Sequence, residues 1–197
     1  MARIDGRLLL SSSRDGVTWS EPTSIGDAPT SISDLEAVLF KGKFFVFYDP
    51  AVLNCITGDG RHWASSTPVA SYCSSQGWAQ MSSVSAAVSQ GIDRVVWIDT
   101  RFTRSDDGDN FLSRNPWSGD PTWSNNDVLS LPLRSLGGGS SEKALPVRLT
   151  PDLAYARSVR AKATPQGLYV MWIGRAKVGK ALDSFHEPPM LFLVVLT

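Results

Sequence analysis

The sequence has few cysteines and no excess of basic over acidic residues. Cys55 and Cys73 are the only cysteines in 197 residues, too few for a disulfide scaffold or a zinc site. The two thiols fit one disulfide or, as we favour, two unpaired side chains. Nineteen basic and nineteen acidic residues give zero formal charge, whereas nucleic-acid-binding proteins usually have a basic excess. We therefore expect no cofactor and no nucleic-acid partner.

Long apolar runs are also absent. No stretch of eighteen apolar residues occurs, so the sequence predicts no membrane span. Residues 1–13 carry charges at Arg3, Asp5 and Arg7 beside only three consecutive leucines, which is not the pattern of a signal peptide. The compartment stays open between the cytoplasm and secretion by another route. With 42% hydrophobic residues, the chain can form one domain with a proper core.

Three segments share one pattern: a short strand, a turn that contains glycine, and a strand rich in β-branched and aromatic residues. They cover residues 35–48, 84–97 and 159–172. Each has the composition of a β-hairpin, and proline or glycine interrupts every window long enough for a helix. The sequence therefore predicts an all-β fold built from repeats.

A second motif, Ser/Thr-x-Asp-Gly-x-x-aromatic, recurs at residues 13–19, 57–63 and 105–111. The copies lie about 44 to 48 residues apart, within the ~40–50-residue period of propeller blades. Its Asp is suited to accept backbone N–H groups, its glycine to adopt a positive φ, and its aromatic ring to pack back under the hairpin. Residues 185–188 are a degenerate fourth copy, because they echo residues 19–22.

The motif resembles the Asp box, or bacterial neuraminidase repeat, of sialidases and related propeller lectins, although it has one residue fewer between Asp and Gly than the commonest form. In that family the boxes are structural and lie away from the active site. The resemblance implies the same role for Asp15, Asp59 and Asp107. It also implies a β-propeller with a sialidase-like or lectin-like function.

We accordingly predict one domain, residues 1–197, that forms a small β-propeller of about four, or alternatively five, four-stranded antiparallel blades. In the clearest repeat we expect strands at Leu35–Phe40, Phe44–Tyr48 and about Val52–Thr57, with the fourth after Trp63. The first blade lacks its first strand and most of its second.

Two parts of the chain do not follow the repeat. Met190–Leu196 is strongly strand-like, and we expect it to complete the first blade, so that pairing of the termini closes the ring and hides the edge strands. Residues 118–157 are longer than a junction needs; we favour a long functional insertion over a degenerate fifth blade. An incomplete ring closed by a homo-oligomer is a further alternative.

One face of such a propeller carries the candidate ligand-binding residues. The boxes lie on the other face, because they join third strands to fourth strands. Indole rings stack on the apolar side of a sugar, while Asp and Arg bond its hydroxyls. Taken singly, Asp49 and Asp99 also fit turn caps that pair with the arginines. The candidates are Asp49, Asp99, Arg101, Arg175, Trp78, Trp117 and Trp123, with Glu36 and Arg160 on first strands that face the central channel.

The sequence favours a carbohydrate-binding, lectin-like propeller whose partner is a glycan or small saccharide. By the resemblance, sialidase catalysis needs three arginines, a tyrosine beside a glutamate, an aspartate acid and a Phe-Arg-Ile-Pro motif. That motif is absent, and neither Tyr155 nor Tyr169 has a convincing glutamate partner in the sequence, so no catalytic residue is assigned. A sialidase-like glycoside hydrolase is the second hypothesis, and a protein-interaction scaffold is the third.

Overall fold

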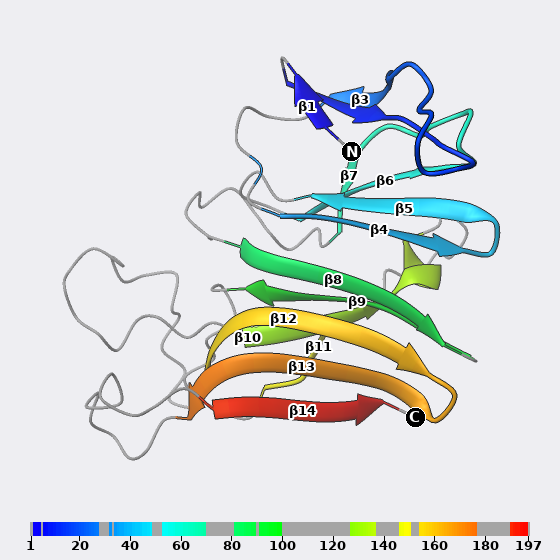
Figure 1. The fold of residues 1–197 in the computed structure, drawn as a ribbon. Coiled ribbons are helices and arrows are strands. Elements are labelled where there is room, and N and C mark those ends of the chain that lie inside the picture. Colours follow the sequence, from blue (N-terminus) through cyan, green and yellow to red (C-terminus); the bar gives the residue numbers. More distant parts are fainter. Residues whose placement is uncertain are drawn as a thin grey trace, which may run out of the picture.

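The computed structural model of this chain is all-β (Figure 1). It describes residues 2–4, 6–27, 32, 34–48, 53–69, 81–89, 91–99, 127–136, 146–150, 154–176 and 190–196. The strands within these ranges form four antiparallel sheets, each made of strands that are consecutive in the chain. We number the sheets from first to fourth in chain order. In the described part of the chain, no helix has the length and hydrophobicity needed to cross a bilayer.

The first two sheets match the repeat closely. The second sheet has the predicted succession of four neighbouring strands, and the first sheet lacks the strand that would precede β1 in that pattern. The first sheet consists of β1 (Ala2–Ile4), β2 (Arg7–Leu10) and β3 (Thr23–Asp27), and the second of β4 (Leu35–Phe40), β5 (Lys43–Tyr48), β6 (Asn54–Gly58) and β7 (Thr67–Pro68).

The other two predicted hairpins are confirmed as β8–β9 and β12–β13. Both continue with further antiparallel strands, so that each sheet is again a simple succession. The third sheet consists of β8 (Met81–Ser89), β9 (Ile92–Asp99), β10 (Asp127–Pro132) and β11 (Val147–Arg148), with the 3₁₀ turn η3 (Leu133–Ser135) after β10; the fourth consists of β12 (Ala154–Thr164), β13 (Gly167–Ala176) and β14 (Met190–Leu196).

The third strand of the third sheet differs from the prediction. It is β10, whose alternate side chains enter the apolar clusters on both sides of the sheet. The motif at 105–111, expected between the third and fourth strands, falls in the connection from β9 to β10, outside the described residues. Residues 118–157, which we interpreted as an insertion, contribute β10, η3, β11 and the start of β12.

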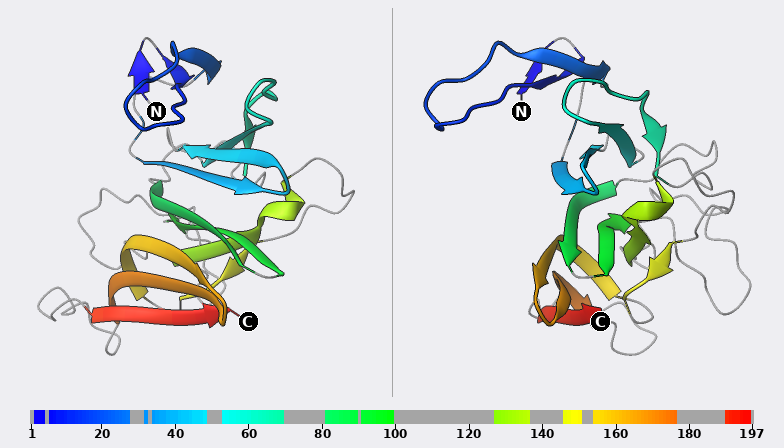
Figure 2. Two further views of the ribbon diagram at one scale, coloured as in Figure 1. Left: turned by 45° about the vertical axis from the view of Figure 1, so that its right-hand side comes forward. Right: turned by 90° about the vertical axis from the view of Figure 1, so that its right-hand side faces the viewer.

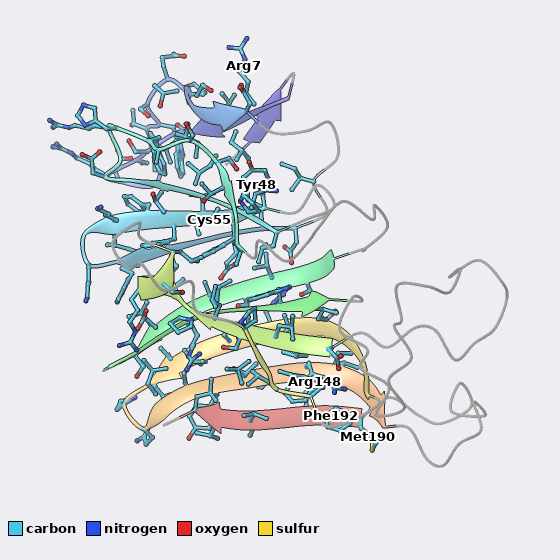
Figure 3. The ribbon with its side chains drawn as sticks, turned by 180° about the vertical axis from the view of Figure 1, so that it is seen from behind. Arg7, Tyr48, Cys55, Arg148, Met190 and Phe192 are labelled. Atoms are coloured by element: carbon cyan, nitrogen blue, oxygen red, sulfur yellow. The ribbon has the colours of Figure 1, made fainter. Side chains whose placement is uncertain are left out.

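The segment Met190–Leu196 forms the predicted strand, but in a different sheet. It pairs with β13, from Leu168↔Leu196 to Gly174↔Met190, and the Phe192 ring stacks on Trp172 at a centroid distance of 5.5 Å. This packing fixes β14 in the fourth sheet (Figure 3). The first and fourth sheets lie at opposite ends of the molecule (Figure 1). The predicted pairing of the termini is therefore wrong.

The sheets stack in chain order, with one apolar cluster between each neighbouring pair (Figure 2). On β5, Phe45 and Phe47 pack against the third sheet, whereas Val46 and Tyr48 pack against the first. The run 95–98 on β9 alternates in the same way between the second and fourth sheets. Both runs are continuously apolar because both faces of their sheets are buried.

Candidate functional site

The first copy of the Ser/Thr-x-Asp-Gly-x-x-aromatic motif, residues 13–19, which we call the first box, has the local chemistry that the sequence predicts. Asp15 Oδ1 accepts the N–H groups of Val17 and Thr18, both at 2.8 Å. Ser13 Oγ accepts the Gly16 N–H at 2.8 Å and donates to Asp15 Oδ1 at 2.9 Å, while Gly16 has a φ of 75°. The Thr18 N–H, then the Val17 N–H, hold the pKa of Asp15 well below its usual range.

The second box repeats this arrangement. Asp59 Oδ1 accepts the N–H groups of His62 at 2.7 Å and Arg61 at 2.8 Å, and Gly60 has a φ of 95°. The His62 N–H, then the Arg61 N–H, lower the pKa of Asp59. In both boxes one carboxylate oxygen therefore accepts N–H groups from residues two and three positions further along the same turn, so these bonds shape the turn.

The two box tryptophans differ. Trp63 packs back as predicted: its ring stacks on Phe44 at 6.2 Å, and a Cβ on Gly58 would meet the indole at 2.5 Å. Trp19 is 61% exposed, on a segment that projects from the first sheet (Figure 2). The packing predicted for the aromatic residue of the motif is therefore wrong at Trp19.

The first strands of the second, third and fourth sheets, β4, β8 and β12, contact one another in turn. At the edge of β8, Asp34 Oδ2 accepts the Val84 N–H at 2.8 Å and Glu36 Oε1 accepts the Ala86 N–H at 3.2 Å. These side chains supply acceptors for backbone donors that no strand of the same sheet pairs.

The same two positions recur one sheet later. At the edge of β12, Ser83 Oγ accepts the Val159 N–H at 3.1 Å, and Ser85 Oγ accepts the Ala161 N–H at 3.1 Å. In the hairpin alignment Ser83 corresponds to Asp34, and Ser85 to Glu36. The second and third sheets are therefore each joined to the first strand of the next sheet through polar side chains at equivalent positions.

A β-bulge orients the side chain of Ser83 in this network. The register shifts between Ser82 and Val84, and Ser83 has a φ of 66°, which is uncommon for a residue other than glycine. Ser158 lies at the equivalent shift in β12 with a φ of 50°. Because a bulge redirects a side chain, the distortion directs Ser83 toward β12.

Arg160 joins the network from the fourth sheet. Its Nη1 donates to Ser83 Oγ at 3.2 Å and to the Val159 carbonyl at 2.7 Å. Burial raises the pKa of Glu36; the Asp34 charge also raises it, whereas the Ala86 N–H and the Arg160 charge lower it. We call the residues Asp34, Glu36, Ser83, Ser85 and Arg160 the first-strand cluster.

The structure describes the side chains of two of the predicted site residues, Glu36 and Arg160, and brings both into this cluster. Asp99 and Arg175 lie near the ends of β9 and β13, opposite the first residues of β8 and β12; their side chains are not described. Asp49, Trp78, Arg101, Trp117 and Trp123 lie outside the described residues. The prediction for these seven positions remains untested.

Sequence reasoning missed Asp34 and Ser83. The available signal was a short polar residue immediately before each aligned hairpin, at Asp34, Ser83 and Ser158. The strand pattern hid it, because the bulges at Ser83 and Ser158 interrupt the simple alternation of β8 and β12.

Two other carboxylates are buried in ion pairs that join elements of the third sheet. Asp93 Oδ1 lies 3.0 Å from Arg134 Nη2 of η3, and Asp127 Oδ1 lies 2.9 Å from Arg148 Nε of β11. Thr150 Oγ1 also donates to Asp127 at 2.6 Å. Within the described ranges, no three His, Cys, Asp or Glu side chains gather as metal ligands.

Comparison of the chain with protein-family models, with curated proteins and with solved structures finds no match. The function is therefore inferred from the chemistry of the first-strand cluster.

Proposed function

We propose that the four sheets are blades of an open β-propeller and that the protein is a carbohydrate-binding, lectin-like module. Three features support the propeller: each sheet is a succession of antiparallel strands, the sheets stack in chain order, and their first strands are neighbours. The two described Asp-box turns add local support, because they carry the hydrogen bonds expected of that motif.

The observation that carries the binding proposal is the composition of the first-strand cluster. It combines two carboxylates, two hydroxyls and one guanidinium from three sheets. Sugar hydroxyls both donate and accept, so they bind well where carboxylate acceptors stand beside guanidinium donors. Backbone N–H groups already hold Asp34, Glu36, Ser83 and Ser85, and such preorganisation lowers the entropy cost of binding.

A glycan array screened with the full chain tests the proposal, with calorimetry on every glycan that binds. Replacing Arg160 by Ala should weaken binding by about 1–3 kcal/mol, the range of a binding hot spot. Arg61→Ala is the matched control, because that exposed arginine lies on the Asp59 turn. Binding lost equally in both variants, or no glycan bound at all, would contradict the proposal.

Glycoside hydrolysis is a second candidate function, because the carboxyl groups of Asp34 and Glu36 both lie at the edge of β8 and burial raises the pKa of Glu36. Glycosidases pair a carboxylic acid that stays protonated with a carboxylate that stays ionised. A panel of fluorogenic glycosides, sialosides included, tests this function. Turnover that Glu36→Gln abolishes while glycan affinity is kept would identify a hydrolase, whereas binding without turnover would support the lectin.

A further inference from the structure

The fourth sheet presents an apolar surface on the side away from the third sheet. The side chains that form this surface lie in three cross-strand pairs between β13 and β14. Leu191 and Leu193 are 70% and 55% exposed, and Ile173 and Val195 are exposed as well. We call this surface the outer face of the fourth sheet: Tyr169, Met171, Ile173, Leu191, Leu193 and Val195.

The repeat shows what kind of surface this is. In the hairpin alignment, Met171 and Ile173 occupy the places of Val96 and Ile98 on β9. Those two side chains are fully buried against the next sheet, and Phe47, at the same place on β5, is buried in the same way. The outer face therefore has the composition of a face that another sheet covers. A contiguous exposed apolar patch of this composition is a candidate interaction site.

We propose that the outer face of the fourth sheet is a dimer interface and that its occupant is the same face of a second copy of this chain. The chain's own first sheet lies at the opposite end of the molecule (Figure 1). A head-to-tail contact with the first sheet of a second copy is disfavoured, because the outer side of that sheet presents the exposed pair Arg7 and Asp27. Packing these charges against apolar rows would desolvate them.

Face-to-face packing instead sets apolar rows against apolar rows. A two-fold axis that runs along the strands, between β13 and β14, places β13 of one copy over β14 of the other. The exposed cations Arg160 and Lys162 lie on β12, opposite Met171 and Tyr169, so they fall at the margin of the contact. Homodimer interfaces commonly have this apolar centre and charged rim, and symmetric two-fold dimers are the commonest oligomers.

The size of the face sets the expected strength. The seven paired positions of β13 and β14, at about 3.3 Å per residue and about 4.8 Å strand spacing, present roughly 200 Å² in projection. Stable interfaces bury about 800 Å² per partner. The accessible area of this face exceeds its projected area, because the side chains stand out from the sheet, but it stays below that value. The dimer should therefore be weak and reversible.

Sedimentation velocity on the full chain, over a concentration series, tests the proposal. We expect a monomer–dimer equilibrium, which Leu193→Lys or Leu191→Lys should weaken at least about tenfold, since each buries a charge in the contact. Val147→Lys on β11 is the control, because this exposed apolar residue lies on another sheet, and it should leave the equilibrium unchanged. Circular-dichroism melts verify that all three variants fold.

Leu9→Lys separates the two geometries. Leu9 lies on the outer side of the first sheet, since the preceding residue, Leu8, is buried toward the second sheet. Face-to-face association predicts no effect of this variant, whereas a head-to-tail contact would be broken. A monomer at every concentration, a dimer indifferent to both Leu191→Lys and Leu193→Lys, or a dimer broken by Leu9→Lys would each overturn the proposal.

Discussion

Ser83 on β8 bonds both backbone polar groups of Val159 on β12. Its Oγ accepts the Val159 N–H at 3.1 Å and donates to the Val159 carbonyl at 3.2 Å. The contact joins the edges of two different sheets, and it depends on the left-handed backbone at Ser83. This single side chain therefore links the local distortion of one strand to the packing of the next sheet and to Arg160 in the proposed site.

We predict that Ser83→Ala destabilises the protein by about 1–3 kcal/mol, because the Val159 N–H loses its acceptor. Ser83→Gly loses the same bonds but relieves the positive φ, so it should cost about 1 kcal/mol less than Ala. Urea denaturation measures both. At Ser89, which donates to the Thr164 carbonyl at 2.7 Å without a positive φ, Ala should be the milder substitution. If Ala were the milder substitution at both Ser83 and Ser89, or Gly at both, the role of the bulge would be contradicted.

Glu36→Gln should change how stability depends on pH. The pKa of Glu36 is raised above its ordinary value of 4.5, so the folded state holds this proton more tightly than the unfolded chain. The wild type should therefore lose stability relative to Glu36→Gln as the pH rises from 4.5 through the raised pKa. Gln keeps an oxygen acceptor for the Ala86 N–H. Parallel stability curves for the two proteins would show that burial of Glu36 has no such effect.

Asp59→Ala should lower the melting temperature and leave the glycan affinity of the folded protein unchanged. Asp59→Asn keeps an oxygen acceptor, so it should lower the melting temperature less. The pKa of Asp15 and that of Asp59 are both lowered in the fold. Their contribution is therefore present above the ordinary carboxyl pKa and is lost as the pH falls below about 4. Thermal melts of the wild type and of the double variant Asp15→Asn/Asp59→Asn, at pH values above and below about 4, measure this contribution. Loss of binding with a normal melt would place a ligand at the box turns.

Cys55 should resist thiol reagents in the folded protein. Its side chain is buried on β6 (Figure 3) and free of any disulfide, as we favoured from the sequence, and burial raises the pKa of the thiol to about 12. The thiolate is the reactive form, so in a Cys73→Ser background labelling should proceed only as fast as unfolding. Labelling at the rate of an exposed thiol would contradict the packing of the second sheet.

Local sequence patterns predicted the hairpins of the second and third sheets because β5 and β9 are buried on both faces. The continuous apolar runs at 44–48 and 95–98 require covering sheets on either side, and they identified β5 and β9 closely. The partner of β14 could not be predicted in this way, because no local pattern contains its contacts with β13, such as the stacking of Phe192 on Trp172. The composition of a segment predicts that it forms a strand, but it does not predict which strand it pairs with.

The third copy of the box motif misplaced a strand for a related reason. The motif specifies a turn by hydrogen bonds within a few residues, and nothing in it fixes which strands the turn connects. The candidate site divides along the same line. Alternation along the strands identified Glu36 and Arg160, whereas Asp34 and Ser83 depend on contacts between sheets that no local pattern contains.

The most direct test of this account is a titration of the ¹⁵N-labelled protein with a glycan that it binds, followed through backbone amide shifts. Binding at the first-strand cluster predicts the largest shifts at the amides of residues 34–37, 83–86 and 158–161, with the Asp59 turn unchanged. Shifts confined to the box turns, or spread over sheets distant from β4, β8 and β12, would contradict it.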